Sequence, residues 1–120
     1  IHILADAVQL SQLVQNIIAN AMKYGRAGSP ITVDLVQQQQ RAILTIRDQG
    51  EGIAAEHIPR LTERFYRVDD ARSRSVGGTG LGLSIVKHIA ERHQGQLDIT
   101  SVVGEGTTVR VSFPITSAPI

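Results

Sequence analysis

The chain has 120 residues and a formal net charge of +1. This is enough for one domain with a single core, and no strong positive field argues for a nucleic acid or a membrane surface as partner. Aromatic residues make up 3% of the chain and cysteine is absent, which argues against a base-stacking surface and excludes disulfides and thiolate metal sites. No signal peptide and no apolar run of about 18 residues is visible.

A long amphipathic helix is predicted over residues 7–24, after an apolar opening at residues 1–4 that favours a short strand in a piece of a longer protein. Asp6 suits the helix N-cap, and Gln9 completes a loose capping box three residues on. Gly25 is a typical C-terminal stop. The helix therefore has clear signals at both ends.

Two stripes run along this predicted helix. Asn16, Asn20 and Lys23 fall on one narrow arc at i, i+4 and i+7. Taken alone, that arc is most simply a solvated helix face. The apolar stripe beside it is broad and predicts the core-facing side: Leu10, Leu13, Val14, Ile17, Ile18 and Ala21.

Two alternating segments, residues 31–35 and 42–48, are predicted to be strands joined by a short polar hairpin connection. Side chains alternate between the faces of a strand, so Asp48 points the same way as Leu44 and Ile46, toward the core. A buried carboxylate is costly without hydrogen-bond donors. Asp48 must therefore have donors there, and an ordinary turn or capping role is the alternative.

An irregular, arginine-rich segment over residues 62–78 follows a short helix that is predicted for residues 54–61 and interrupted by Pro59. A structureless stretch of this length in a small domain favours a functional lid. A solvated charged loop is the simpler alternative.

A glycine-rich run over residues 77–83 leads into an amphipathic helix at residues 84–93. A flexible loop entering a helix start offers unpaired N–H groups and a positive dipole end, which suit phosphate. Two closing strands are predicted for residues 96–102 and 107–114, and parity places Thr107 on the inward face.

The order of these motifs closely resembles the catalytic, ATP-binding domain of bacterial sensor histidine kinases. The wider relatives are DNA gyrase B and the ninety-kilodalton heat-shock chaperones. Residues 16–24 resemble the N box, 48–52 the first glycine box, 63–67 the F box in the style of phosphate-regulon sensor kinases, 78–83 the second glycine box and 104–107 the third. The resemblance covers nearly the whole chain.

The resemblance implies roles for individual residues. Asp48 would accept a hydrogen bond from the adenine amino group, and Thr107 would assist through a bridging water. Asn20 would hold Mg²⁺ through its amide oxygen, and Lys23 would neutralise phosphate charge. Asn16 would lie beside the metal and phosphates, where gyrase and the chaperones have a water-activating glutamate. Since asparagine is a poor general base, phosphoryl transfer is favoured over hydrolysis.

Arg67, at the end of the F-box match, is the candidate for phosphate contact or lid locking. The catalytic positions would thus be Asn16, Lys23 and Arg67. The resemblance also implies nucleotide contacts at the remaining motif positions: Tyr24, Gly50, Gly52, Ile53, Gly78, Thr79, Gly80, Leu81, Gly82 and Leu83.

The implied fold is a two-layer α/β sandwich of Bergerat type, with a mixed, mostly antiparallel sheet, about three helices on one face and an ATP lid. Residues 1–120 would form one catalytic domain. Its function would be transfer of the γ-phosphoryl group of Mg·ATP to a histidine on a separate dimerisation domain, and from there to a response-regulator receiver domain. The domain itself would be monomeric and cytoplasmic, in a homodimeric, membrane-anchored parent.

Two departures stand out. Thr62 replaces the usual first phenylalanine of the F box, which leaves the lid geometry open. The acceptor-histidine motif is also missing, because no histidine of the chain has the required acidic and Thr-Pro or Asn-Pro context: His2, His57, His88 and His93.

Other functions fit less well. A Rossmann dehydrogenase needs a buried strand before its glycines, and residues 72–76 cannot form one. An anti-sigma-factor serine kinase shares the implied fold and would differ in its protein substrate. A nucleotide-gated binding module, in which ATP orders the lid without transfer, remains the alternative from another class.

Overall fold

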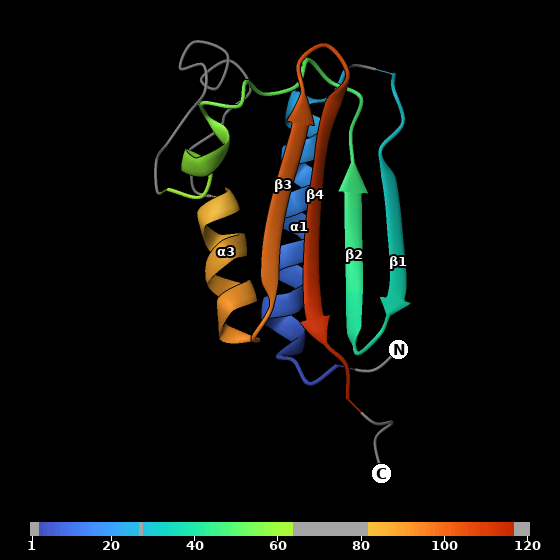
Figure 1. The fold of residues 1–120 in the computed structure, drawn as a ribbon, viewed down its shortest axis with the longest axis vertical. Coiled ribbons are helices and arrows are strands. Elements are labelled where there is room, and N and C mark those ends of the chain that lie inside the picture. The colour runs from blue at the N-terminus through green and yellow to red at the C-terminus, as the bar shows by residue number, and fades with distance from the viewer. Residues whose placement is uncertain (1–2, 27, 64–81, 117–120) are drawn as a thin grey trace.

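A computed structural model of the chain describes residues 3–26, 28–63 and 82–116 (Figure 1). Within the described residues, a helix followed by a two-stranded antiparallel hairpin occurs twice along the chain. In chain order the elements are α1 (Ala7–Tyr24), β1 (Thr32–Gln38), β2 (Arg41–Arg47), the 3₁₀ turn η1 (Ile58–Arg60), α3 (Gly82–Arg92), β3 (Gln96–Val102) and β4 (Gly106–Pro114).

The strands form one sheet in the order β1-β2-β4-β3. Helices α1 and α3 pack against each other and lie on one face of the sheet (Figure 1). The expected two-layer α/β sandwich is confirmed. Each described pairing is antiparallel, so the sheet of the described residues is not mixed. The described residues contain two α-helices and one 3₁₀ turn; the expectation of about three helices stays a prediction, because it also concerns residues outside the described ranges.

The core lies between the helices and the central strands β2 and β4. Leu13 and Ile17 from α1 are fully buried, as are Ile46 of β2 and Val111 of β4. Leu44 and Ile46 pair with Val111 and Val109 across the β2–β4 ladder, which confirms the predicted inward face. Burial of this aliphatic face is the main favourable term holding the helices on the sheet.

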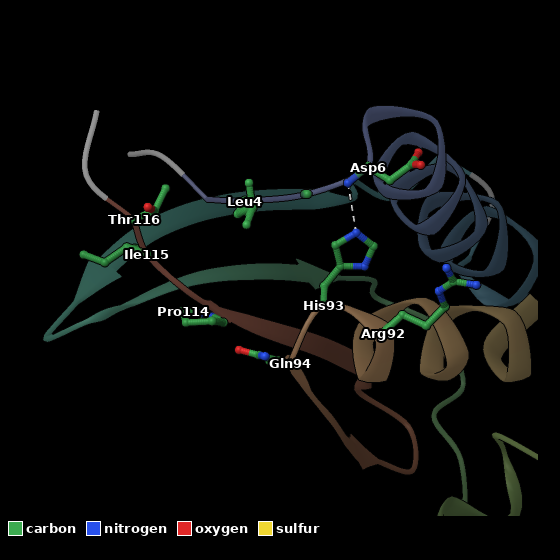
Figure 2. Close-up of a pocket in the computed structure, with 9 residues that line it drawn as sticks. Leu4, Asp6, Arg92, His93, Gln94, Pro114, Ile115 and Thr116 are labelled. Atoms are coloured by element: carbon green, nitrogen blue, oxygen red, sulfur yellow. Dashed lines mark hydrogen bonds between the residues drawn. The ribbon is translucent and has the colours of Figure 1, made fainter. Parts of the chain in front are cut away.

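At the start of α1, one hydrogen bond of the predicted capping box is present and the other is replaced. Asp6 Oδ1 accepts from the Gln9 N–H at 3.0 Å, so Asp6 is the N-cap. The Asp6 N–H donates to Nε2 of His93 at 3.0 Å (Figure 2), and Nδ1 of His93 lies 2.8 Å from the Ile89 carbonyl oxygen. His93 thus ties the start of α1 to the end of α3, a capping role in place of the bond expected from Gln9.

Two local predictions are wrong. Residues 3–4 form no strand, because they pair with no strand in the described ladders and Leu4 is largely exposed. Residues 54–61 form turns and the short η1 rather than an α-helix, because Pro59 stands at the start of the turn and cannot donate the N–H that a longer helix would need.

Candidate nucleotide site

Three motif-bearing segments meet at one end of the sheet. Asp48 follows the last residue of β2, and its N–H donates to the Thr107 carbonyl at 2.9 Å. Gly25, the C-cap of α1, forms a bridge with Gly50. The end of α1, the end of β2 and the start of β4 therefore lie together, at the upper end of the sheet in Figure 1.

The Asp48 carboxylate is the buried charged group of this end, with 6% of the residue exposed. Its Oδ1 accepts from the Gly50 N–H at 3.0 Å and from the Thr107 N–H at 3.3 Å. Its second oxygen makes no hydrogen bond to the residues described. Burial raises the pKa of Asp48 from the ordinary value of 3.8, and outweighs the lowering by the N–H groups of Thr107 and Gly50.

Two glycines allow this close packing of backbone on backbone. Gly52 has φ +78° and Gly106 has φ +141°, which side chains rarely adopt. A Cβ on Gly52 would overlap the Val102 carbonyl, and one on Gly106 would overlap the Asp48 carbonyl. Glycine is therefore required at both positions to bring the loop after β2 against the β3–β4 hairpin.

Ser101, which the sequence motifs do not include, connects the same two segments. Its Oγ accepts from the Ile53 N–H at 2.7 Å, donates to the Gly106 carbonyl at 2.9 Å and lies 2.8 Å from Thr107 Oγ1. Ser101 stands directly opposite Thr107 in the β3–β4 ladder. Working out the register of that hairpin from the sequence would have found this pair.

The polar arc of α1 is half-buried at all three positions, Asn16, Asn20 and Lys23, which a fully solvated helix face would not be. Nδ2 of Asn16 is buried and has no hydrogen-bond partner among the described residues. A buried donor normally has an acceptor, so an orphaned donor here fits an oxygen-rich ligand such as a phosphate chain. The residues present thus fit the nucleotide that the motifs imply.

A metal ion at this end would have few protein ligands. Within the described ranges, no three His, Cys, Asp or Glu side chains gather to hold one. Mg²⁺ commonly keeps its waters and binds one or two protein oxygens together with substrate phosphates. An amide oxygen on the arc of α1 is compatible with such a site, and a cage built from protein side chains alone is not.

Several predicted contacts lie outside the described residues: Arg67, Gly78, Thr79, Gly80, Leu81 and most of the lid at residues 62–78, together with the side chain of Tyr24. Of the second glycine box, Gly82 is the first residue of α3. Leu83 is buried in the core, so its side chain packs there and does not contact a ligand.

A pocket of about 490 Å³ lies at the other end of the two helices (Figure 2). It is lined by the chain around Asp6, by Arg92 to Gln94 at the end of α3, and by Pro114 to Thr116 after β4. None of the motif residues lines it. The candidate site is therefore the end that holds Asp48.

Comparison with known proteins identifies the family. Residues 5–117 match the model of the histidine kinase-, DNA gyrase B- and HSP90-like ATPases. The chain belongs to this ATPase family. Membership in the ATPase family implies that the chain binds ATP, and the antiparallel sheet with its two helices agrees with the family's α/β fold.

Similar proteins include sensor kinases from several bacteria. The chain is 46% identical over 112 residues to the sensor histidine kinase RppB of Synechocystis sp., covering 93% of this chain and 25% of that protein. It is 42% identical over 113 residues to the phosphate regulon sensor protein PhoR of Pseudomonas aeruginosa, covering 94% and 26%. The chain therefore spans about a quarter of the length of these relatives.

Solved structures agree with the family assignment. A mycobacterial sensor histidine kinase, MprB, superposes with a TM-score of 0.84 and 34% identity over 93% of this chain and 76% of that one. Full-length ShkA, solved in complex with AMPPNP, gives 0.79 and 27% over 98% and 24%. In the part of this ATPase-family chain that the structure describes, no helix is long and apolar enough to cross a membrane.

Proposed function

We propose that the chain is the ATP-binding catalytic domain of a sensor histidine kinase, which transfers the γ-phosphoryl group of ATP to a histidine on a separate helical domain. The observation that carries the proposal is the Asp48 carboxylate: it is buried, one oxygen is held by two backbone N–H groups, and the other has no bond to the described chain. Such an oxygen is an acceptor that a ligand donor could use.

An ionised carboxylate accepts hydrogen bonds and cannot donate them. Asp48 would therefore pair with the amino group of adenine and repel the keto oxygen of guanine at the same place. Sites built on a buried hydrogen bond reject the mismatched analogue strongly. The buried Thr107 lies beside Asp48 and would contribute through a bridging water.

The half-buried arc of α1 would receive the phosphates. Asn16 would donate its orphaned N–H to a phosphate oxygen, Asn20 would hold Mg²⁺ through its amide oxygen, and Lys23 would offset the negative charge. When bound, Mg²⁺ would neutralise charge on the phosphate oxygens. Arg67 and the lid would close over the phosphates, with Gly78, Thr79, Gly80, Leu81 and Gly82 offering backbone N–H groups.

Transfer rather than hydrolysis is supported by the side chain at position 16. An amide cannot take a proton from water as a carboxylate does, so the chain would position the γ-phosphoryl group for a nucleophile supplied from outside. In the transfer, an imidazole nitrogen forms the new P–N bond as the P–O bond to ADP breaks. A response-regulator aspartate would then receive the phosphoryl group, and the sensor would be a homodimer.

A calorimetric titration tests the nucleotide site. The wild-type chain is expected to bind ATP in the presence of Mg²⁺ and to bind GTP much more weakly. Asp48→Asn keeps an acceptor oxygen for Gly50 and Thr107 but loses the charge, so ATP affinity should fall about 10- to 150-fold. Asp34→Asn, an exposed carboxylate on β1, is the matched control and should change nothing. Equal binding of ATP and GTP, or indifference to Asp48→Asn, would contradict the proposal.

A further inference from the structure

Ser101 lies next to Thr107, which together with Asp48 is proposed to contact the adenine base. It lies on β3, directly opposite Thr107 on β4, and the side chains of a directly opposed pair share one face of the sheet. That face is the one on which Thr107 and Asp48 are buried. Ser101 is itself only partly buried, and none of the glycine boxes contains it.

The hydrogen bonds of Ser101 use the full capacity of its hydroxyl group. A serine hydroxyl has one proton to donate and two lone pairs to accept. The Ile53 N–H, 2.7 Å away, occupies one lone pair. The Gly106 carbonyl, 2.9 Å away, can only accept and so takes the proton. One lone pair is left for Thr107, whose Oγ1 lies at 2.8 Å.

This count fixes the direction of the bond between the two hydroxyl groups. If Ser101 gave its proton to Thr107, two oxygens with no hydrogen between them would stand 2.9 Å apart at Gly106. The arrangement that satisfies all three contacts has Thr107 donating to Ser101. The Thr107 hydroxyl is then left with lone pairs only, and it acts as an acceptor toward anything else it meets.

Asp48 and Thr107 are held together by two hydrogen bonds, one between their backbones and one from the Thr107 backbone to the Asp48 side chain. The Asp48 N–H donates to the Thr107 carbonyl at 2.9 Å, and the Thr107 N–H donates to Asp48 Oδ1 at 3.3 Å. The remaining carboxylate oxygen of Asp48 is an acceptor as well. Two neighbouring side chains would therefore present acceptors and no donor to a ligand.

We propose that Ser101 is a specificity-determining positioning residue: by accepting a hydrogen bond from the Thr107 hydroxyl, it leaves Asp48 and Thr107 with acceptors only toward a base, and so selects an amino group over a keto oxygen. The inference rests on the proposed nucleotide function and deepens it. An adenine amino group, or a water between it and Thr107, can donate to these acceptors. A keto oxygen at the same place finds no donor.

Ser101→Ala tests this directly. Without Ser101, the Thr107 hydroxyl can turn its proton toward the ligand and donate to a keto oxygen. Affinity for ATP and for inosine triphosphate, which has a keto oxygen in place of the amino group, is measured by calorimetry on the 120-residue chain. The ratio of the two affinities should fall at least about fivefold. A loss of packing alone would weaken both nucleotides equally and leave the ratio unchanged.

Matched variants separate the alternatives. Ser101→Thr keeps the hydroxyl and should retain the wild-type ratio, and Thr100→Ala, an exposed neighbour on the opposite face of β3, should do the same. In a Thr107→Val background, Ser101→Ala should no longer change the ratio, because its effect passes through the Thr107 hydroxyl. If Ser101→Ala does not fold, Ser101→Cys, with its weak sulfur donor and acceptor, should lower the ratio in its place.

The possible outcomes separate a failure of the proposed nucleotide function from a failure of the proposed role of Ser101. A wild-type chain that binds neither nucleotide overturns the proposed function, and this inference with it. Wild-type selectivity for ATP that survives unchanged in Ser101→Ala or Ser101→Cys overturns the inference alone. A selectivity change by Ser101→Ala that persists in the Thr107→Val background also overturns it, because Ser101 would then act by another route.

Discussion

Replacing Asp48 by Asn should make the chain more stable at neutral pH while removing most of its affinity for ATP. Burial raises the pKa of this carboxyl above 3.8, so the folded chain binds the proton more tightly than the unfolded chain does. The free energy of unfolding therefore falls as the pH rises from the ordinary pKa of the carboxyl through its raised pKa. Above the raised pKa, the full cost of burying the ionised carboxylate is present. Asparagine carries no charge and does not incur this cost.

The expected change in the free energy of unfolding is modest, because Asp48→Asn keeps the contacts of the carboxylate. The amide oxygen of Asn can still accept from the Gly50 and Thr107 N–H groups, so no buried donor is stranded. We expect Asp48→Asn to raise the free energy of unfolding at pH 7 by about 1 kcal/mol, as stabilising single substitutions commonly do, and the gain should vanish as pH approaches 4. Wild-type affinity for ATP should fall over the same pH range as the carboxylate is protonated.

Urea denaturation of both chains between pH 4 and pH 8, without nucleotide, measures the difference. A variant that is about 1 kcal/mol less stable than wild type at pH 7 would refute the reasoning, because it would mean that the charge stabilises the fold. A difference that stays constant with pH would also refute it, since the account assigns the whole effect to ionisation of Asp48.

Three further substitutions, two of them paired with a control substitution, test other features of the structure. Gly106→Ala should prevent stable folding, seen as lost cooperative melting, because its Cβ would overlap a backbone oxygen of the loop after β2; Gly104→Ala, with open space around it, should cost only about 1 kcal/mol. In denaturant titrations, Leu13→Ala in the core should cost about 2–5 kcal/mol, while Val8→Ala, 78% exposed on the same helix, should cost less than about 0.5 kcal/mol. Asn16→Leu should not lower the free energy of unfolding, because its buried N–H has no partner to lose and is costly to bury, yet it should lower ATP affinity about fivefold in calorimetry.

The sequence was sufficient to place Asp48 and Thr107. Strand parity put both side chains on the buried face, and the cost of burying a carboxylate required donors, which the Gly50 and Thr107 N–H groups supply. The bounds of α1 followed from Asp6 and Gly25 at its ends, because caps are local and are recognised by residue type.

What the sequence could not predict depends on contacts between distant segments. The bond from the Asp6 N–H to His93 joins residues 87 positions apart, and no local pattern contains it. The role of Ser101 depends on the register of the β3–β4 pair, which motif matching ignores. Residues 3–4 have an apolar, strand-like pattern, yet a strand forms only where a neighbour is present to share its hydrogen bonds.

The most direct test of the central claim is phosphoryl transfer from ATP to histidine. The chain is mixed with the separately produced helical dimerisation domain of its parent protein, ATP labelled at the γ-phosphate and Mg²⁺. The account predicts label on the helical domain that is labile to acid and stable to base, as phosphohistidine is, and predicts its loss with Asp48→Asn but not with Asp34→Asn. Tight, Asp48-dependent ATP binding without such label would contradict the kinase assignment and favour a nucleotide-gated binding module, and acid-stable label would indicate a serine or threonine kinase instead.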